Sequence, residues 1–152
     1  ILRSAAAFGF ENVILLSCAD PLSPRALRAS MGAVFRVGLV EITDGAAFGR
    51  MIRDAGRRLV CASPGDGAET AALSENCLCA GETPLCANDC IVIGNEGHGV
   101  SDEVLGAAST YLRIPMTETS ESLNASAAAA VILWEYSKLR DSRQNKPDGE
   151  KN

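Results

Sequence analysis

The stretch CIVIGNEGHG, at positions 90–99, joins a short apolar run to a glycine-rich turn. Cys90 to Ile93 has the length and composition of a strand that is buried on both faces. Glycines follow at 94, 97 and 99, and Ser101 can then cap a helix that has Asp102 and Glu103 in its first turn. Strand, turn and helix in this order predict one unit of an α/β domain.

The same alternation extends in both directions from this stretch. Helices are expected over Ile1–Phe8, from Ser23-Pro24 to Gly32, over Asp44–Ala55 and over Asn124–Leu139. Strands are expected over Val13–Leu16, Val37–Ile42, Leu59–Ala62 and Tyr111–Ile114. The helix over 44–55 should bury Phe48, Met51, Ile52 and Ala55, whereas Ser63–Asn88 should be mostly loop. The pattern predicts a mainly parallel sheet flanked by helices.

The length of 152 residues and an apolar fraction of 47% fit one soluble domain. We assign residues 1–140 to this domain and 141–152 to a polar tail. Because a helical pattern is already running at Leu2, we expect the natural start of the chain to lie upstream of Ile1. No apolar run is long enough to span a bilayer and no signal peptide is visible, which favours a cytoplasmic protein with no membrane partner.

Six cysteines raise the question of disulfides or a metal. Without a secretory context, reduced thiols are the better interpretation. The cluster of Cys77, Cys79, Cys86 and Cys90 could supply four zinc thiolates. Its C-x-C and C-x3-C spacings differ from the usual paired C-x2-C, however, so we expect small apolar side chains in and beside a loop, and no metal.

The net charge of −5 argues against strong, nonspecific nucleic-acid binding. Any RNA contact must therefore come from local basic residues. One group is Arg25, Arg28 and Arg36. A second group is Arg50, Arg53, Arg57 and Arg58, for which a solvated helix face is an equally good interpretation.

Two loops should meet at the carboxyl edge of the sheet, where ligands bind in such folds. One is the glycine-rich turn, which is G-x-x-G-x-G rather than the G-x-G-x-x-G of a nicotinamide dehydrogenase. The other contains Ile114-Pro115-Met116 and then Ser122-Leu123-Asn124 at a helix entrance, where Ser and Asn could be plain caps.

Through these segments the chain resembles the SpoU/TrmH family of RNA ribose 2′-O-methyltransferases, within the SPOUT superfamily. Ile1–Gly9 is similar to the end of the family's first motif, Ile93–Gly97 to its second and Ile114–Ala130 to its third. Arg28–Ala33 is similar to a further recurrent segment. The Asn and Gly that open the first motif would lie upstream of Ile1.

The resemblance implies a SPOUT-type fold with a C-terminal trefoil knot, which gathers the loops after Cys61, Ile93 and Ile114 around S-adenosylmethionine. It implies transfer of a methyl group to a ribose 2′-hydroxyl of tRNA or rRNA. The cofactor-binding residues would be Gly94, Ile114, Met116, Ser122, Leu123 and Asn124.

The resemblance also assigns the catalytic residues: Arg3, Asn95, Glu96, Ser122 and Asn124. Because arginine rarely gives up its proton, we interpret Arg3 as a cation that binds phosphate and stabilises a developing alkoxide. Glu96 could instead hold the loop or Arg3 in place. His98, at a position that varies in the family, is not assigned a role.

A homodimer is the last implication, with Arg3 of one chain completing the site of the other. The helix after Asn124 places Ala127, Ala130, Val131 and Trp134 near one face, a pattern that burial within one subunit explains equally well. A noncatalytic RNA-binding or ribosome-assembly protein with the same fold is the alternative function.

Overall fold

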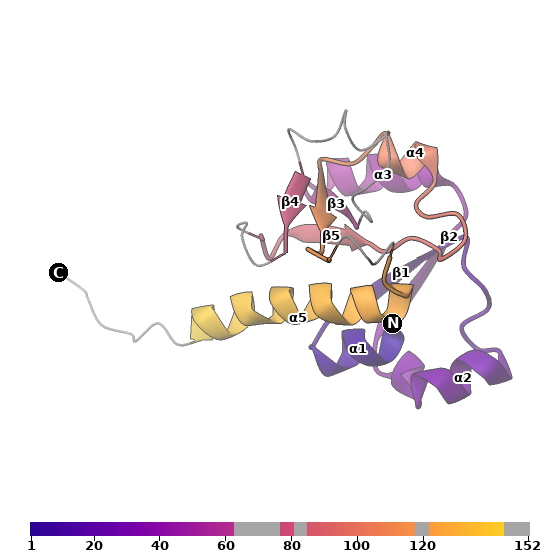
Figure 1. Ribbon diagram of the computed structural model, residues 1–152. Helices are drawn as coiled ribbons and strands as arrows, with labels where there is room; N and C mark the ends of the chain where they lie inside the picture. The colour runs from indigo at the N-terminus through magenta and orange to yellow at the C-terminus, as the bar shows by residue number, and fades with distance from the viewer. Residues whose placement is uncertain (63–76, 81–84, 118–121, 145–152) are drawn as a thin grey trace.

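The computed structural model describes residues 1–62, 77–80, 85–117 and 122–144 (Figure 1). Its helices are α1 (Leu2–Ala7), α2 (Pro24–Ser30), the 3₁₀ helix η1 (Ala33–Phe35), α3 (Gly45–Asp54), α4 (Asp102–Leu105) and α5 (Ala125–Gln144). Its strands are β1 (Asn12–Leu16), β2 (Gly38–Ile42), β3 (Arg58–Ala62), β4 (Cys77–Cys79), β5 (Asp89–Val92) and β6 (Thr110–Arg113). None of the described helices has both the length and the apolarity to cross a membrane.

All pairings among these strands are parallel. β3 lies between β5 and β6, and β4 extends the sheet beyond β6, while β1 and β2 form a separate pair. The register sets Val60 opposite Ile91 and Cys61 opposite Tyr111. The predicted α/β class with a mainly parallel sheet is therefore confirmed.

Helices cover both faces of the four-stranded sheet (Figure 1). Leu59 and Cys61 of β3 point to one face, where Phe48 and Ile52 of α3 pack against them. The alternate residue Val60 points to the other face and packs with Ile132 and Tyr136 of α5. The smaller helix α1 lies against α5, with Ala5 packed on Ala129 and Leu133. This two-sided burial explains why the strands read as continuous apolar runs.

Helix starts follow local capping chemistry. The Ser23 hydroxyl accepts a hydrogen bond from the Ala26 N–H at 3.3 Å, and Pro24 occupies the first turn of α2, as predicted. The Asp44 carboxylate accepts from the Ala47 N–H at 2.9 Å at the start of α3. Ser101 occupies the N-cap of α4, but its side chain makes no capping hydrogen bond.

Three predictions about helices are corrected. The buried stripe of α3 is Gly45, Phe48, Gly49 and Ile52, one turn earlier than predicted, because α3 packs against α4 through this stripe. Met51 is 41% exposed, and Ala55 is exposed as well. Helix α2 ends at Ser30, and Met31, instead of Gly32, is its left-handed C-cap. Helix α5 runs to Gln144, beyond the predicted end at Leu139.

The predicted loop over 63–88 contains a strand. β4 pairs in parallel with β6, which sets Leu78 opposite Leu112. Its three residues are too few for a periodic signal, and their partner lies more than thirty residues later in the chain. The remainder of that loop, at 63–76 and 81–84, lies outside the described residues.

An ion pair with a buried carboxylate joins the sheet to α5. The fully buried Asp89 carboxylate accepts from Arg58 Nε and Nη2, each at 2.7 Å, from the Tyr136 hydroxyl at 2.7 Å and from the Cys86 N–H at 2.9 Å. Burial opposes ionisation of Asp89, but these hydrogen bonds outweigh it and lower its pKa. Of the two interpretations left open for the second arginine group, a solvated helix face is wrong for Arg58, since it opens β3 and binds Asp89.

We expect Asp89→Asn to lower the free energy of unfolding by about 1–3 kcal/mol at pH 7, because the buried side chain loses its charge-assisted hydrogen bonds to Arg58 and Tyr136. The folded-state pKa of Asp89 is lowered, so its contribution is complete above the unfolded-state pKa of roughly 4 and is lost as pH falls through the folded value. Urea denaturation from pH 7 to pH 3 measures both effects. Exposed Asp54→Asn is the control, and a deficit of Asp89→Asn that stays constant down to pH 3 would contradict the ionic explanation.

Candidate functional site

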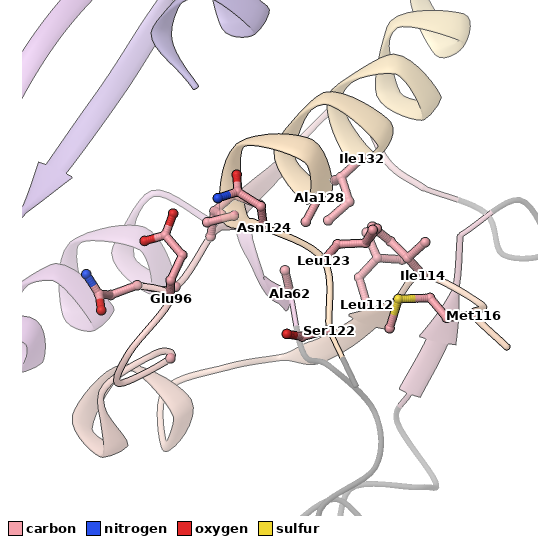
Figure 2. Close-up of a pocket in the computed structure, with 15 residues that line it drawn as sticks. Ala62, Glu96, Leu112, Ile114, Met116, Ser122, Leu123, Asn124, Ala128 and Ile132 are labelled. Carbon is pink, nitrogen blue, oxygen red and sulfur yellow. The ribbon is translucent and has the colours of Figure 1, made fainter. Parts of the chain in front are cut away.

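A cavity of about 410 Å³ opens at the carboxyl ends of β3, β5 and β6 (Figure 2). Ala62 ends β3, Gly94 follows β5 and Ile114 follows β6, and all three line it. Helix α5 forms a further wall through Ala128 and Ile132. The parallel sheet therefore gathers loops that are distant in sequence around one space.

Eight of the nine predicted site residues line this cavity: Gly94, Asn95, Glu96, Ile114, Met116, Ser122, Leu123 and Asn124. The ninth, Arg3, lies exposed on α1 and is not among the lining residues. Sequence reasoning did not identify Ala128 and Ile132 as lining residues. They follow Asn124 at four-residue intervals, and this helical spacing is the signal that could have found them.

Asn95 holds the glycine-rich loop in a closed form. Its side-chain oxygen accepts from the N–H groups of Gly97 at 2.8 Å and His98 at 3.3 Å. Its backbone N–H and carbonyl pair with those of Gly99 at 2.9 and 2.8 Å. The loop crosses so tightly that a Cβ on Gly94 would stand 2.5 Å from the Gly99 carbonyl carbon. Only glycine fits at position 94 without moving backbone.

Asn124 caps the start of α5, which is one of the two interpretations that the sequence allowed for this residue. Its side-chain oxygen accepts from the Ser126 N–H at 2.9 Å and from the Ser126 hydroxyl at 2.6 Å. Its carbonyl accepts from the N–H groups of Ala127 and Ala128. Within the described part of the chain, the Asn124 amide nitrogen donates no hydrogen bond, so it can donate to a ligand.

The cavity has polar and apolar regions. In Figure 2 the Glu96 carboxylate and the Asn124 amide lie on one side, and Ile114 and Met116 lie on the other. Glu96 is exposed and forms no ion pair with any described residue, so the structure does not join it to Arg3. An apolar wall with a few convergent polar groups is typical of a small-molecule site, and the volume falls within the usual range of roughly 300–1,000 Å³.

None of the cysteines whose side chains the structure describes lines this cavity. Burial raises the pKa of Cys61 to about 12, and it also raises the pKa of Cys90, so both are thiols at neutral pH. Cys86 is exposed. Among the described side chains, which do not include that of Cys77, no three from His, Cys, Asp or Glu residues come close enough to hold a metal ion.

Comparison with known proteins gives consistent matches. The model of the SpoU rRNA Methylase family matches residues 1–134. An uncharacterized tRNA/rRNA methyltransferase of Mycobacterium tuberculosis is 30% identical over 136 residues, which are 89% of this chain and 45% of that protein. The chain thus spans less than half the length of this relative.

Two solved structures share the fold. The crystal structure of an RNA 2′-O ribose methyltransferase superposes with a TM-score of 0.75 at 31% identity, over 92% of this chain and 50% of the other. The SpoU methyltransferase AviRb of Streptomyces viridochromogenes, in complex with AdoMet, superposes with a TM-score of 0.74 at 29% identity, over 93% and 55% of the two chains.

We expect Gly94→Ala to lower the free energy of unfolding by about 1–3 kcal/mol, because the added methyl group forces the Gly94 and Gly99 backbones apart. Gly97→Ala in the same loop is the matched control, since its Cβ would meet only the Asn95 side-chain oxygen, at 3.3 Å. Denaturant unfolding compares the two variants. Equal stability of both would show that the loop tolerates opening at position 94.

Proposed function

Because the chain belongs to the SpoU rRNA methylase family, we propose that it transfers a methyl group from S-adenosylmethionine to a ribose 2′-hydroxyl of a tRNA or an rRNA. One observation carries the proposal: residues predicted from two separate loops line a single cavity. The similarity to an RNA 2′-O ribose methyltransferase favours the ribose over a base as the acceptor.

The residues of the cavity fit S-adenosylmethionine. The tight turn at Gly94 exposes backbone that a larger residue would cover, and Ile114, Met116 and Leu123 offer apolar surface and backbone groups. Ser122 adds a hydroxyl and Asn124 an amide nitrogen. The AdoMet complex of the similar AviRb supports this assignment. When bound, the cofactor supplies an electrophilic methyl group on sulfur.

Positioning should provide much of the rate, because the attacking oxygen must lie in line with the methyl group at roughly 3 Å. The Glu96 carboxylate and the Asn124 amide can orient the ribose from the polar side of the cavity, while Asn95 keeps the loop that carries Glu96 in place. The guanidinium group of Arg3 binds an RNA phosphate and stabilises the negative charge that develops on the ribose oxygen, as the 2′-hydroxyl proton passes to water and the oxygen takes the methyl group.

Since Arg3 does not line the cavity of its own chain, it must reach a site by another route. We infer that it enters the cavity of a second copy in a homodimer that pairs through α1 and α5. The outer face of α5 supports this arrangement, because Trp134 is 51% exposed and Val131 is 39% exposed. Phe8, the C-cap of α1, contacts Trp134 with ring centroids 5.7 Å apart, so the apolar side chains of α5 continue onto the end of α1.

We also propose that the C-terminal segment forms the trefoil knot of the SPOUT superfamily. Two features support it: β6 is inserted between β3 and β4, and the chain then returns through Ser122 to the cavity at the ends of β3 and β5. A crystal structure in which this segment passes outside the preceding loop would contradict the knot.

We expect Asn124→Ser to retain the cap oxygen and the stability of α5 but to slow methyl transfer about a hundredfold, because the amide donor is lost. Asn124→Ala should lose about 1 kcal/mol of stability as well. Single-turnover transfer from labelled S-adenosylmethionine, with mapping of 2′-O-methyl sites in RNA from cells lacking the gene, measures the effect. Full activity of Asn124→Ser would show that Asn124 acts only as a helix cap. Methylation of bases alone would refute the proposed reaction.

For the dimer, we expect Val131→Glu to produce a monomer by sedimentation and to abolish methyl transfer, because a charge would be buried between subunits. Met51→Glu, at similar exposure on α3, should remain a dimer. Mixing Arg3→Ala with Asn124→Ala subunits should restore partial activity, since a mixed dimer has one intact composite site. No recovery from mixed dimers would contradict the action of Arg3 in the partner's site.

A further inference from the structure

A second surface, formed by α2, η1 and their flanking residues, combines exposed apolar and basic side chains. We call it the α2–η1 surface and define it by Leu22, Arg25, Arg28, Met31, Phe35 and Arg36, all of which are exposed. Phe35 is 75% exposed and Met31 is 69% exposed, the highest values among the large apolar residues that are exposed. This exposure is unfavourable for an isolated soluble chain and indicates that a partner covers these side chains.

The fold holds Phe35 outward by an ordered turn. Met31 and Gly32 both take left-handed conformations, with φ of 50° and 73°. The Phe35 N–H then donates to the Gly32 carbonyl at 3.2 Å. Beneath the turn, Ala33 and Val34 are buried and anchor it to the domain. A ring presented in this way loses little conformational entropy when it binds a partner.

The segment that forms the α2–η1 surface contains only positive charges, and Asp20, whose carboxylate accepts from the Leu22 N–H at 2.8 Å, borders it. No Asp or Glu occurs between Pro21 and Val40, although the whole chain carries a net charge of −5. Arg25, Arg28 and Arg36 form no ion pair with any residue that the structure describes. Three exposed guanidinium groups, without an ion pair among the described residues, and an exposed ring on adjoining elements fit a polyanion with aromatic faces.

We infer that the α2–η1 surface binds a single-stranded segment of the RNA substrate, with a base stacked on Phe35 and backbone phosphates held by Arg25, Arg28 and Arg36. Every base has a π-face for stacking, and guanidinium groups bind phosphate oxygens in pairs. The inference rests on the proposed function for the identity of the RNA as substrate.

The position of the surface agrees with this role. Helix α1, which carries Arg3, packs against both η1 and α2 (Figure 1). RNA bound on the α2–η1 surface therefore lies next to the helix that carries Arg3. This arrangement also explains how an acidic chain can hold RNA, because the contacts are confined to one basic region.

The test measures binding of a fluorescein-labelled oligouridine and of a matched RNA duplex to the intact protein. Phe35→Ala should raise the dissociation constant for oligouridine roughly 5- to 150-fold, the range expected for loss of one stacked base. Phe35→Tyr should restore binding, and Met51→Ala, an exposed apolar control on α3, should leave it unchanged. Phe35→Ala should have little effect on the duplex, whose bases are already stacked.

Two further measurements identify the contacts. Each of Arg25→Gln, Arg28→Gln and Arg36→Gln should reduce the slope of log affinity against log salt by roughly 0.7, the value for one phosphate contact on a single strand, whereas Arg50→Gln should not. Oligouridine carrying 5-iodouridine should crosslink to Phe35 on irradiation, as located by peptide mass spectrometry.

Unchanged oligouridine affinity in Phe35→Ala would overturn the inference. A change in its sedimentation would also overturn it, by showing that Phe35 lies in a contact between copies of the chain. Calorimetry of S-adenosylmethionine binding and mapping of 2′-O-methyl sites test the proposed function separately. Phe35-dependent binding without methylation would refute the proposed function and retain the α2–η1 surface as an RNA-binding site. Methylation with RNA binding that does not depend on Phe35 would retain the function and refute the RNA-binding role of the surface.

Discussion

Parallel pairing of β3 with β5 on one edge and β6 on the other is the constraint on which the rest of the structure depends. Parallel strands end at the same edge of a sheet, so the chain leaves β3, β5 and β6 close to one point and the loops there meet around the cavity. Such strands also require crossovers that cover both faces. The layers of α3 and α4 on one side and of α5 on the other follow from this requirement.

Helix α5 links the two ends of the sheet. Its Tyr136 hydroxyl binds Asp89 at the amino end of β5, whereas Ile132 and Ala128 line the cavity at the opposite end. Asn124 and Tyr136 are separated by about 18 Å of helix at 1.5 Å per residue. The Asp89 carboxylate, which is paired with Arg58, thus anchors through Tyr136 the helix that forms one wall of the cavity.

The polar residues of the site use only part of their hydrogen-bonding capacity for the fold. The side-chain oxygen of Asn95 accepts from two backbone N–H groups, and that of Asn124 accepts from the N–H and the hydroxyl of Ser126, which fixes both side chains at the cavity. A side chain held in this way presents its remaining groups to a ligand without further ordering. The fold and the proposed chemistry therefore favour asparagine at these positions for complementary reasons.

The sequence by itself determined the class of fold, most element positions and the loops that form the cavity, because apolar periodicity, capping residues and glycine spacing act locally. Tertiary structure decided what depends on distant partners. Arg58 looked like a solvated residue until Asp89, 31 positions later, was placed beside it. β4 exists only through its pairing with β6, and the buried stripe of α3 was set by α4. Similarly, the exposure of Phe35 and the separation of Arg3 from the cavity depend on how α1, α2 and η1 pack, and local pattern contains no information about which face of a short helix finds a neighbour.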